Sequence, residues 1–180
     1  MSRTLLLRRR IKLLTWLMIL GLALSGATAI PLETELNWLA RLLGVNSTTW
    51  TPVSEGFDAW IHRIWIGLQE TGTHYPFLAY GTDWLAFGHF VIAIGFIGAL
   101  RDPVRNIWLF QFGMIACVLV LPYAIFFGGL RGIPNYWRFV DIAFGAFGFV
   151  PLGFAHYWTR ELARSISGSQ TTTTDLHFQS

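Results

Sequence analysis

The chain has 180 residues, of which 53% are hydrophobic and only 13% are charged. Soluble domains carry about 25% charged residues, so this composition excludes an ordinary water-soluble protein and favours one whose solvent is the lipid bilayer. The formal net charge of +3 does not indicate a nucleic-acid partner, because five of the thirteen basic residues lie in the first twelve positions, beside a hydrophobic run. Such a cluster sets membrane topology and contacts anionic lipids.

Residues 13–30 form the first apolar run and are about long enough to cross the hydrocarbon core of a bilayer. The basic segment before this run, and Ala27-Thr28-Ala29 near its end, also resemble a signal peptide with its cleavage site. We expect a retained membrane anchor rather than a cleaved signal.

Residues 31–82 form the only long polar segment, and they hold two amphipathic patterns separated by a loop at 44–52. The apolar positions that recur at helical spacing are Leu32, Leu36, Leu39 and Leu43 in the first pattern, and Phe57, Trp60, Ile61, Ile64 and Leu68 in the second. Tryptophans in this segment suit a membrane interface, where the ring and its N–H both find partners. The patterns predict two short helices on the outer face of the membrane.

Three further apolar runs predict membrane spans at 84–100, 107–127 and 139–158. The polar residues 161–180 are expected to form a flexible tail. Residues 1–160 are therefore predicted to form an all-α integral membrane four-helix bundle.

Short polar signals mark the ends of these spans. Thr82 is expected to cap the second span, with Asp83 in its first turn. Asp102 and Pro103 are suited to be the N-cap and first residue of the third span, which makes the second and third spans an antiparallel hairpin. Pro122 is expected to kink the third span.

The distribution of basic residues predicts the orientation. With the N-terminus inside, the inner segments hold nine lysines and arginines and the outer segments hold four. Positive charge is enriched on the cytoplasmic side, so both termini are predicted to be cytoplasmic.

Ionisable residues within spans are costly and are candidates for function. Asp141, Gly145 and Gly148 share one face of the fourth span, and small residues mark a face that packs on other helices. Asp141 is therefore expected to point into the bundle, with Arg138 within reach for an ion pair. Such a pair could be purely structural.

His89 lies six residues into the second span, about 9 Å below Asp83. It could bind a haem or chlorophyll, relay protons, or donate a hydrogen bond to Gln111 or to a backbone carbonyl. Asp83 itself could be no more than a helix cap. His89 is expected in the outer half of the second span, whereas His156 lies near the inner end of the fourth. Two histidines at different depths cannot hold one haem between them, so such a haem is not expected. A haem or pigment with a single histidine ligand stays open.

The motifs of common enzymes are missing: there is no phosphate-binding glycine loop, no HExxH and no GxSxG. The single Cys117 permits no intramolecular disulfide, and no metal site is predicted. A set of polar residues remains at the outer ends of the spans. The catalytic candidates are His89, Asp141, Arg138 and Asp83, and the ligand-binding candidates are Arg131, Arg138 and His74. Arginines with carboxylates and a histidine could bind an anionic headgroup or support acid–base chemistry.

Four phrases cover most of the chain after residue 20: LSGATAIPLETEL, YPFLAYGTDWLAFGHF, LRDPVRN and RGIPNYWRFVDIAFGAFG. In these the chain resembles uncharacterised bacterial inner-membrane proteins of similar length. The resemblance implies a bacterial inner-membrane setting and carries no mechanism.

Two functions are consistent with these features, and the sequence does not decide whether the protein is an enzyme. The first is a structural or accessory subunit that packs on a larger membrane complex, on lipid, on a quinone or on a pigment, or that forms a homo-oligomer. The second is an enzyme or ligand-binding protein with a polar site at the outer face, in which His89 and Asp141 would face each other. The cofactor, if one is bound, is not identified by the sequence.

Overall fold

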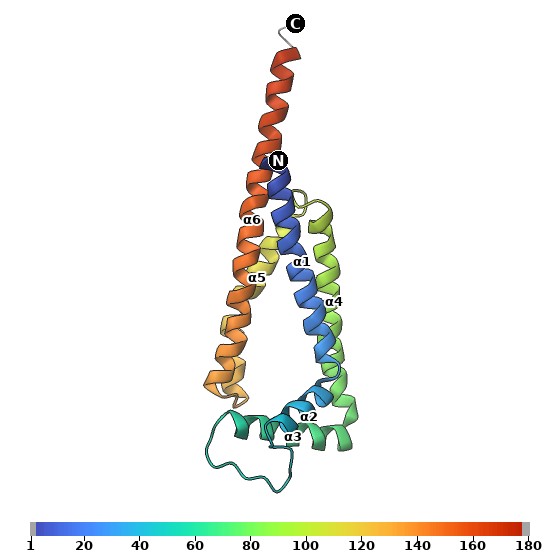
Figure 1. Ribbon diagram of the computed structural model, residues 1–180, viewed down its shortest axis with the longest axis vertical. Helices are drawn as coiled ribbons and strands as arrows, with labels where there is room; N and C mark the ends of the chain where they lie inside the picture. Colours follow the sequence, from blue (N-terminus) through green and yellow to red (C-terminus); the bar gives the residue numbers. More distant parts are fainter. Residues whose placement is uncertain (1–2, 178–180) are drawn as a thin grey trace. The chain divides into compact units, whose positions relative to one another are not determined.

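The computed structural model describes residues 3–177, with side chains up to Ser167, and every regular element in that range is helical. The elements are α1 (Arg3–Ala29), α2 (Leu32–Leu42), α3 (Phe57–His74), the short 3₁₀ helix η1 (Pro76–Ala79), α4 (Tyr80–Arg101), α5 (Ile107–Leu130) and α6 (Asn135–His177) (Figure 1). The prediction of an all-α fold is confirmed.

Four helical segments are long and apolar enough to cross a membrane, and they correspond to the four predicted spans. Their bounds are Arg3–Ala29, Pro76–Arg101, Ile107–Leu130 and Asn135–Ser167. A helix satisfies its own backbone hydrogen bonds, which lipid cannot do, so each apolar run is helical throughout. The protein is therefore a membrane-spanning protein.

The helix that holds the fourth span continues well past its apolar part. The backbone of α6 is helical from Asn135 to His177, whereas the predicted span ends at residue 158. From the sequence, a flexible tail is expected over 161–180. Residues 161–177 have a helical backbone instead, and residues 178–180 lie outside the described residues.

The chain divides into two compact units. The α5–α6 unit comprises Met1–Leu20 and Ala93–Ser180, and the α2–α3 unit comprises Gly21–Ile92. Helices α1 and α4 each run from one unit into the other. Each unit has its own buried side chains and its own polar contacts.

Glycines bring α5 and α6 close together in the α5–α6 unit. A Cβ at Gly145 would stand 2.7 Å from the carbonyl oxygen of Cys117, and one at Gly148 would stand 3.0 Å from its Sγ atom. Gly113 on α5 makes room for Leu152 of α6 in the same way: a Cβ at Gly113 would stand 2.8 Å from the Cδ1 atom of Leu152. Small residues allow this approach, which maximises van der Waals contact between helices in lipid. The predicted packing role of the Gly145 and Gly148 face is confirmed.

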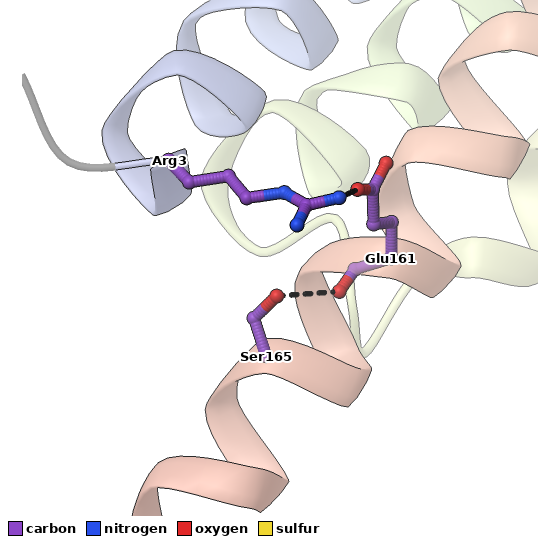
Figure 2. A network of polar contacts seen from close by, with 3 residues as sticks. All are labelled: Arg3, Glu161 and Ser165. Atoms are coloured by element: carbon purple, nitrogen blue, oxygen red, sulfur yellow. Dashed lines mark hydrogen bonds and ion pairs between the residues drawn. The ribbon is translucent and has the colours of Figure 1, made fainter.

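Polar contacts join the start of α1 to α6 in the same unit. Figure 2 shows Arg3 of α1 extending to the carboxylate of Glu161, with which it forms an ion pair. The carbonyl oxygen of Glu161 also accepts a hydrogen bond from the hydroxyl of Ser165 at 3.0 Å (Figure 2). The guanidinium of Arg10 lies over the ring of Trp158, 5.4 Å from its centroid. Part of the basic N-terminal cluster is thus used to hold α1 against α6.

The turn between α4 and α5 differs from the prediction in its capping. Helix α5 begins at Ile107 with Asn106 as its N-cap residue, so Asp102 and Pro103 do not start the third span. The carboxylate of Asp102 instead accepts a hydrogen bond from the backbone N–H of Arg105 at 3.1 Å. The side-chain amide of Asn106 donates to the carbonyl oxygens of Gly98 and Asp102. These bonds engage the Gly98 carbonyl near the end of α4 and two backbone groups of the turn itself, which holds the short turn together.

The two predicted short helices are present in the α2–α3 unit as α2 and α3, and a polar cluster joins them. The side-chain oxygen of Asn37 on α2 accepts hydrogen bonds from the indole N–H of Trp65, at 2.6 Å, and from the amide of Gln69, at 3.1 Å. The Gln69 amide also donates to Glu33. His62 is buried on α3, and its Nδ1 atom bonds the carbonyl of Val45 at 2.7 Å.

The start of α4 also differs from the prediction. The helix begins at Tyr80, directly after η1, so Thr82 lies inside its first turn and is not a cap. The hydroxyl of Thr82 donates to the carbonyl oxygen of Ala79 at 2.7 Å. Asp83 does lie in the first turn, as predicted. The 3₁₀ turn that precedes α4 takes the place of a side-chain cap.

We predict that Gly145→Ala lowers the stability of the protein by about 1–3 kcal/mol, the usual cost of adding a methyl group to a tightly packed site. The added Cβ would meet a backbone oxygen of α5, which cannot move away as a flexible side chain would. Thermal unfolding in detergent, followed by circular dichroism, measures the effect. Gly153→Ala on the same helix is the matched control, because its Cβ would have Met114 at 3.9 Å, an ordinary contact. Equal midpoints for the two variants would contradict the prediction.

Candidate functional site

One pocket in the α5–α6 unit contains two of the predicted functional residues. Its volume is about 590 Å³. Its lining comes from the second half of α5, the following loop and the start of α6: Ala116, Leu119, Val120, Tyr123, Ala124, Phe127, Gly128, Arg131, Ile133 and Asp141. Arg131 and Asp141 are the charged members of this lining. The structure therefore brings together one basic and one acidic side chain in an otherwise apolar pocket.

The position of Asp141 follows from the glycine contact one turn further along α6. Gly145 is pressed against the backbone of Cys117, and residues four apart lie on the same helix face. Asp141 is therefore on the side of α6 that meets α5, where it is half-buried. This agrees with the expectation that it points toward another helix.

Arg138 has a structural position that the sequence did not reveal. Its side chain crosses the glycine pair at the end of α5, so that a Cβ at Gly128 would stand 2.7 Å from the Cδ atom of Arg138. Its Nε–H donates to the carbonyl oxygen of Ile133 at 2.8 Å. Arg138 thus ties the loop between α5 and α6 to the start of α6.

The predicted ion pair between Arg138 and Asp141 is not formed. In the part of the chain that the structure describes, the ion pairs are Arg3 with Glu161 and Arg63 with Glu55. The stem of Arg138 is drawn toward Gly128 and Gly129, where the absence of side chains leaves room for it. Its guanidinium therefore serves the loop rather than the carboxylate one turn along the helix.

His89 belongs to the α2–α3 unit and bonds to its own helix. Its Nδ1 atom lies 2.8 Å from the carbonyl oxygen of Leu85. Because a carbonyl only accepts, Nδ1 carries the proton and Nε2 is the nitrogen that can accept a proton or ligate. Of the alternatives considered above, the backbone hydrogen bond is the one observed. The Cβ of His89 also packs beside Gly26 of α1.

The remaining candidates in the α2–α3 unit are exposed. Asp83 lines a small apolar pocket of about 250 Å³ with Tyr80, Trp84 and Phe87 on the same face of α4. His74 ends α3, and its Nδ1 lies 3.0 Å from the carbonyl oxygen of Glu70. These residues and His89 lie in a different unit from Arg131, Arg138 and Asp141. The facing of His89 and Asp141 therefore stays a prediction.

Further polar contacts were not foreseen from the sequence, and two of them join different helices within one unit. Gln111 of α5 donates from its side-chain amide to the Nε2 atom of His156 on α6, at 3.4 Å. The α2–α3 unit contains the cluster around Asn37, Trp65 and Gln69 described above. The first has no local sequence signal, because its partners come from different helices. For the second, the polar residues at 33, 37, 65 and 69 lie one helical turn apart in pairs, which is a weak indication of a shared polar face.

In the part of the chain that the structure describes, no three His, Cys, Asp or Glu side chains are grouped so that they could hold a metal ion. No family model matches the sequence, and the searches of curated proteins and of solved structures found no match. The site is therefore interpreted from its geometry.

We predict that Arg138→Ala destabilises the protein by about 1–2 kcal/mol, because it removes the hydrogen bond to Ile133 and the packing of the side-chain stem on Gly128. Hydrogen exchange of the loop at 128–134 should become faster in the variant. Arg131→Ala is the matched control, since Arg131 is exposed and should change stability by less than about 0.5 kcal/mol. Unchanged exchange in the loop of Arg138→Ala would refute this role.

Proposed function

We propose that the protein is a structural or accessory subunit of the membrane, without catalytic activity of its own, whose helices pack on a larger membrane complex or on lipid. The observation that supports this most is that polar side chains within the spans form hydrogen bonds inside the protein itself. His89 bonds the backbone of its own helix, Arg138 bonds the adjoining loop, and Gln111 bonds His156. Side chains engaged in holding the fold together are a typical sign of structural polar residues.

The exposed faces of the span helices agree with this proposal. On α6, Phe144 and Phe147 are 72% and 78% exposed, and on α1 Leu13 and Leu24 are exposed by more than 60%. Large apolar faces of this kind are covered in a membrane by lipid tails or by other helices. A subunit that assembles laterally with partners needs such faces.

The proposed setting is the inner membrane of a bacterium, with both termini in the cytoplasm. The excess of lysine and arginine at the N-terminus, at the turn between α4 and α5, and after the fourth span supports this orientation. The short helices α2 and α3 would then lie at the outer face. Their tryptophans are suited to the membrane interface.

Purification from native membranes in a mild detergent tests the proposed function. We expect the full chain to elute with a partner protein, a copy of itself, or a tightly held lipid, quinone or pigment. Mass spectrometry identifies proteins and lipids, and an absorption spectrum detects a haem or pigment. A monodisperse monomer that carries none of these would count against the accessory role.

A second function is favoured by one specific observation, that Arg131 and Asp141 both line one pocket. A ligand-binding protein or enzyme with a polar site at the outer face would use these groups, with His89 as the proton carrier. For that function, His89→Ala and Asp141→Asn should abolish ligand binding while the folded protein still reaches the membrane. If both variants bind as the wild type does, the second function has no site.

The proposed orientation makes a prediction about labelling in intact cells. In a Cys117→Ala background, Val104→Cys places a thiol in the turn between α4 and α5 without changing its charge. Val53→Cys places one in the loop between α2 and α3, where the side chain is fully exposed. A membrane-impermeant maleimide should label the second variant in intact cells and the first only after the membrane is permeabilised. Labelling of Val104→Cys in intact cells would overturn the orientation.

A further inference from the structure

The pocket that contains Arg131 and Asp141 is a long groove along α5. Its lining on that helix extends from Ala116 to Gly128, a length of about 18 Å at 1.5 Å per residue, and Arg131 follows directly after the helix ends. The groove therefore runs from deep within the span to its rim. Its shape suits a ligand that has a long apolar body and a polar end.

The two charged groups lie toward the rim end of this groove. Gly145 is opposite Cys117 and Val120, so Asp141, one turn earlier on the antiparallel α6, is level with about Ala124. Arg131 is the C-cap residue of α5, about 10 Å beyond Ala124, and the flexible stem of arginine allows its guanidinium to shorten that separation. Beyond Asp141 the groove is lined by apolar side chains alone, including Leu119 and Val120.

The character of the lining favours a lipid over a transmembrane helix of a partner. Close packing of a helix requires small residues on the receiving face, and the glycines at 145 and 148 are already occupied by α5. The groove lining mixes the small residues Ala116, Ala124 and Gly128 with the bulky residues Leu119, Tyr123 and Phe127. Of the small residues, Gly128 is already covered by the stem of Arg138. Such a surface fits the flexible chain of a lipid.

We propose that the groove binds a phospholipid with an ethanolamine headgroup, its phosphate on Arg131, its ammonium on Asp141 and an acyl chain along α5. The headgroup carries one anion and one cation with N–H donors, which complement the arginine and the carboxylate. A choline headgroup has the same charges but no N–H donor, and a glycerol headgroup has no cation. This inference deepens the proposed function, because it names the class of lipid on which the protein packs.

Native mass spectrometry of the full-length protein in detergent tests the proposal. The probes are phosphatidylethanolamine, phosphatidylcholine and phosphatidylglycerol with identical acyl chains. The ethanolamine lipid should bind about tenfold more tightly than the other two, the difference expected for one charge-assisted hydrogen bond. Asp141→Asn should remove this preference, whereas Arg131→Gln should weaken the binding of all three lipids by a similar factor.

Matched variants separate this site from general effects of charge and folding. Asp58→Asn and Arg41→Gln change exposed residues of α3 and α2 and should leave the preference unchanged. Asp141→Glu keeps the carboxylate and should retain the preference. Ala124→Leu leaves both charges in place and should reduce the binding of every lipid, so it tests the groove even if Asp141→Asn does not fold.

Three results would overturn the proposal: equal binding of the three lipids by the wild type, an unchanged preference in Asp141→Asn, or full binding by Ala124→Leu. If the wild type shows no preference but loses a co-purifying protein on Asp141→Asn, the groove receives a partner helix instead, and the lipid proposal is wrong. The accessory role can fail independently, because a protein that is purified as a monomer without partner, lipid, quinone or pigment can still show the headgroup preference when lipids are added back.

Discussion

The close approach of α5 and α6 is the interaction on which the α5–α6 unit depends. In lipid there is little hydrophobic gain from bringing two helices together, so their association relies on van der Waals contact and on interhelical hydrogen bonds. Gly145 and Gly148 supply that contact by admitting the backbone and the thiol of Cys117, and Gly113 supplies it by admitting Leu152. Because these glycines fix the rotation of α6, they also fix the direction in which Asp141 points. The candidate groove is thus a consequence of the helix packing.

The polar side chains within the apolar helices follow a common rule: most bond to backbone carbonyls of their own helix. Thr15 donates to Ile11 and Thr159 donates to Ala155, four residues earlier in each case, and His89 bonds to Leu85 in the same manner. Such local bonds satisfy a polar group in a medium that offers no water. Asp141 differs from these residues because an ionised carboxylate only accepts hydrogen bonds and cannot donate to a carbonyl of its own helix. A carboxylate that lines a groove therefore differs from the polar groups that donate to their own helix. It can accept hydrogen bonds from the donors of a ligand, which makes it a candidate ligand site.

Arginine residues perform several distinct tasks in this structure. Arg3 and Arg10 hold α1 against α6 through a carboxylate and an aromatic ring. The Arg3 side chain is 79% exposed and that of Glu161 is 24% exposed, so solvent screens this pair and its contribution to stability is modest. Arg138 uses its stem and its Nε–H to fasten a loop. Arg131 is exposed and lines the groove, so its guanidinium is placed to meet an anionic group there.

The sequence by itself determined the class of the protein, the four spans and the two short helices between the first two, because apolar length and helical periodicity are local properties that a bilayer converts directly into structure. It also identified the packing face of α6 from the spacing of Gly145 and Gly148. What only the tertiary structure decided is which partner each polar side chain takes. Arg138 could reach Asp141 by spacing alone, yet the room above Gly128 and Gly129 draws it to Ile133. Asp102 could cap α5, yet the helix begins only after Asn106, whose side chain makes no capping bond and instead donates to Gly98 on the preceding helix. Such choices depend on groups brought together from separate helices, and sequence spacing within one helix carries no information about them.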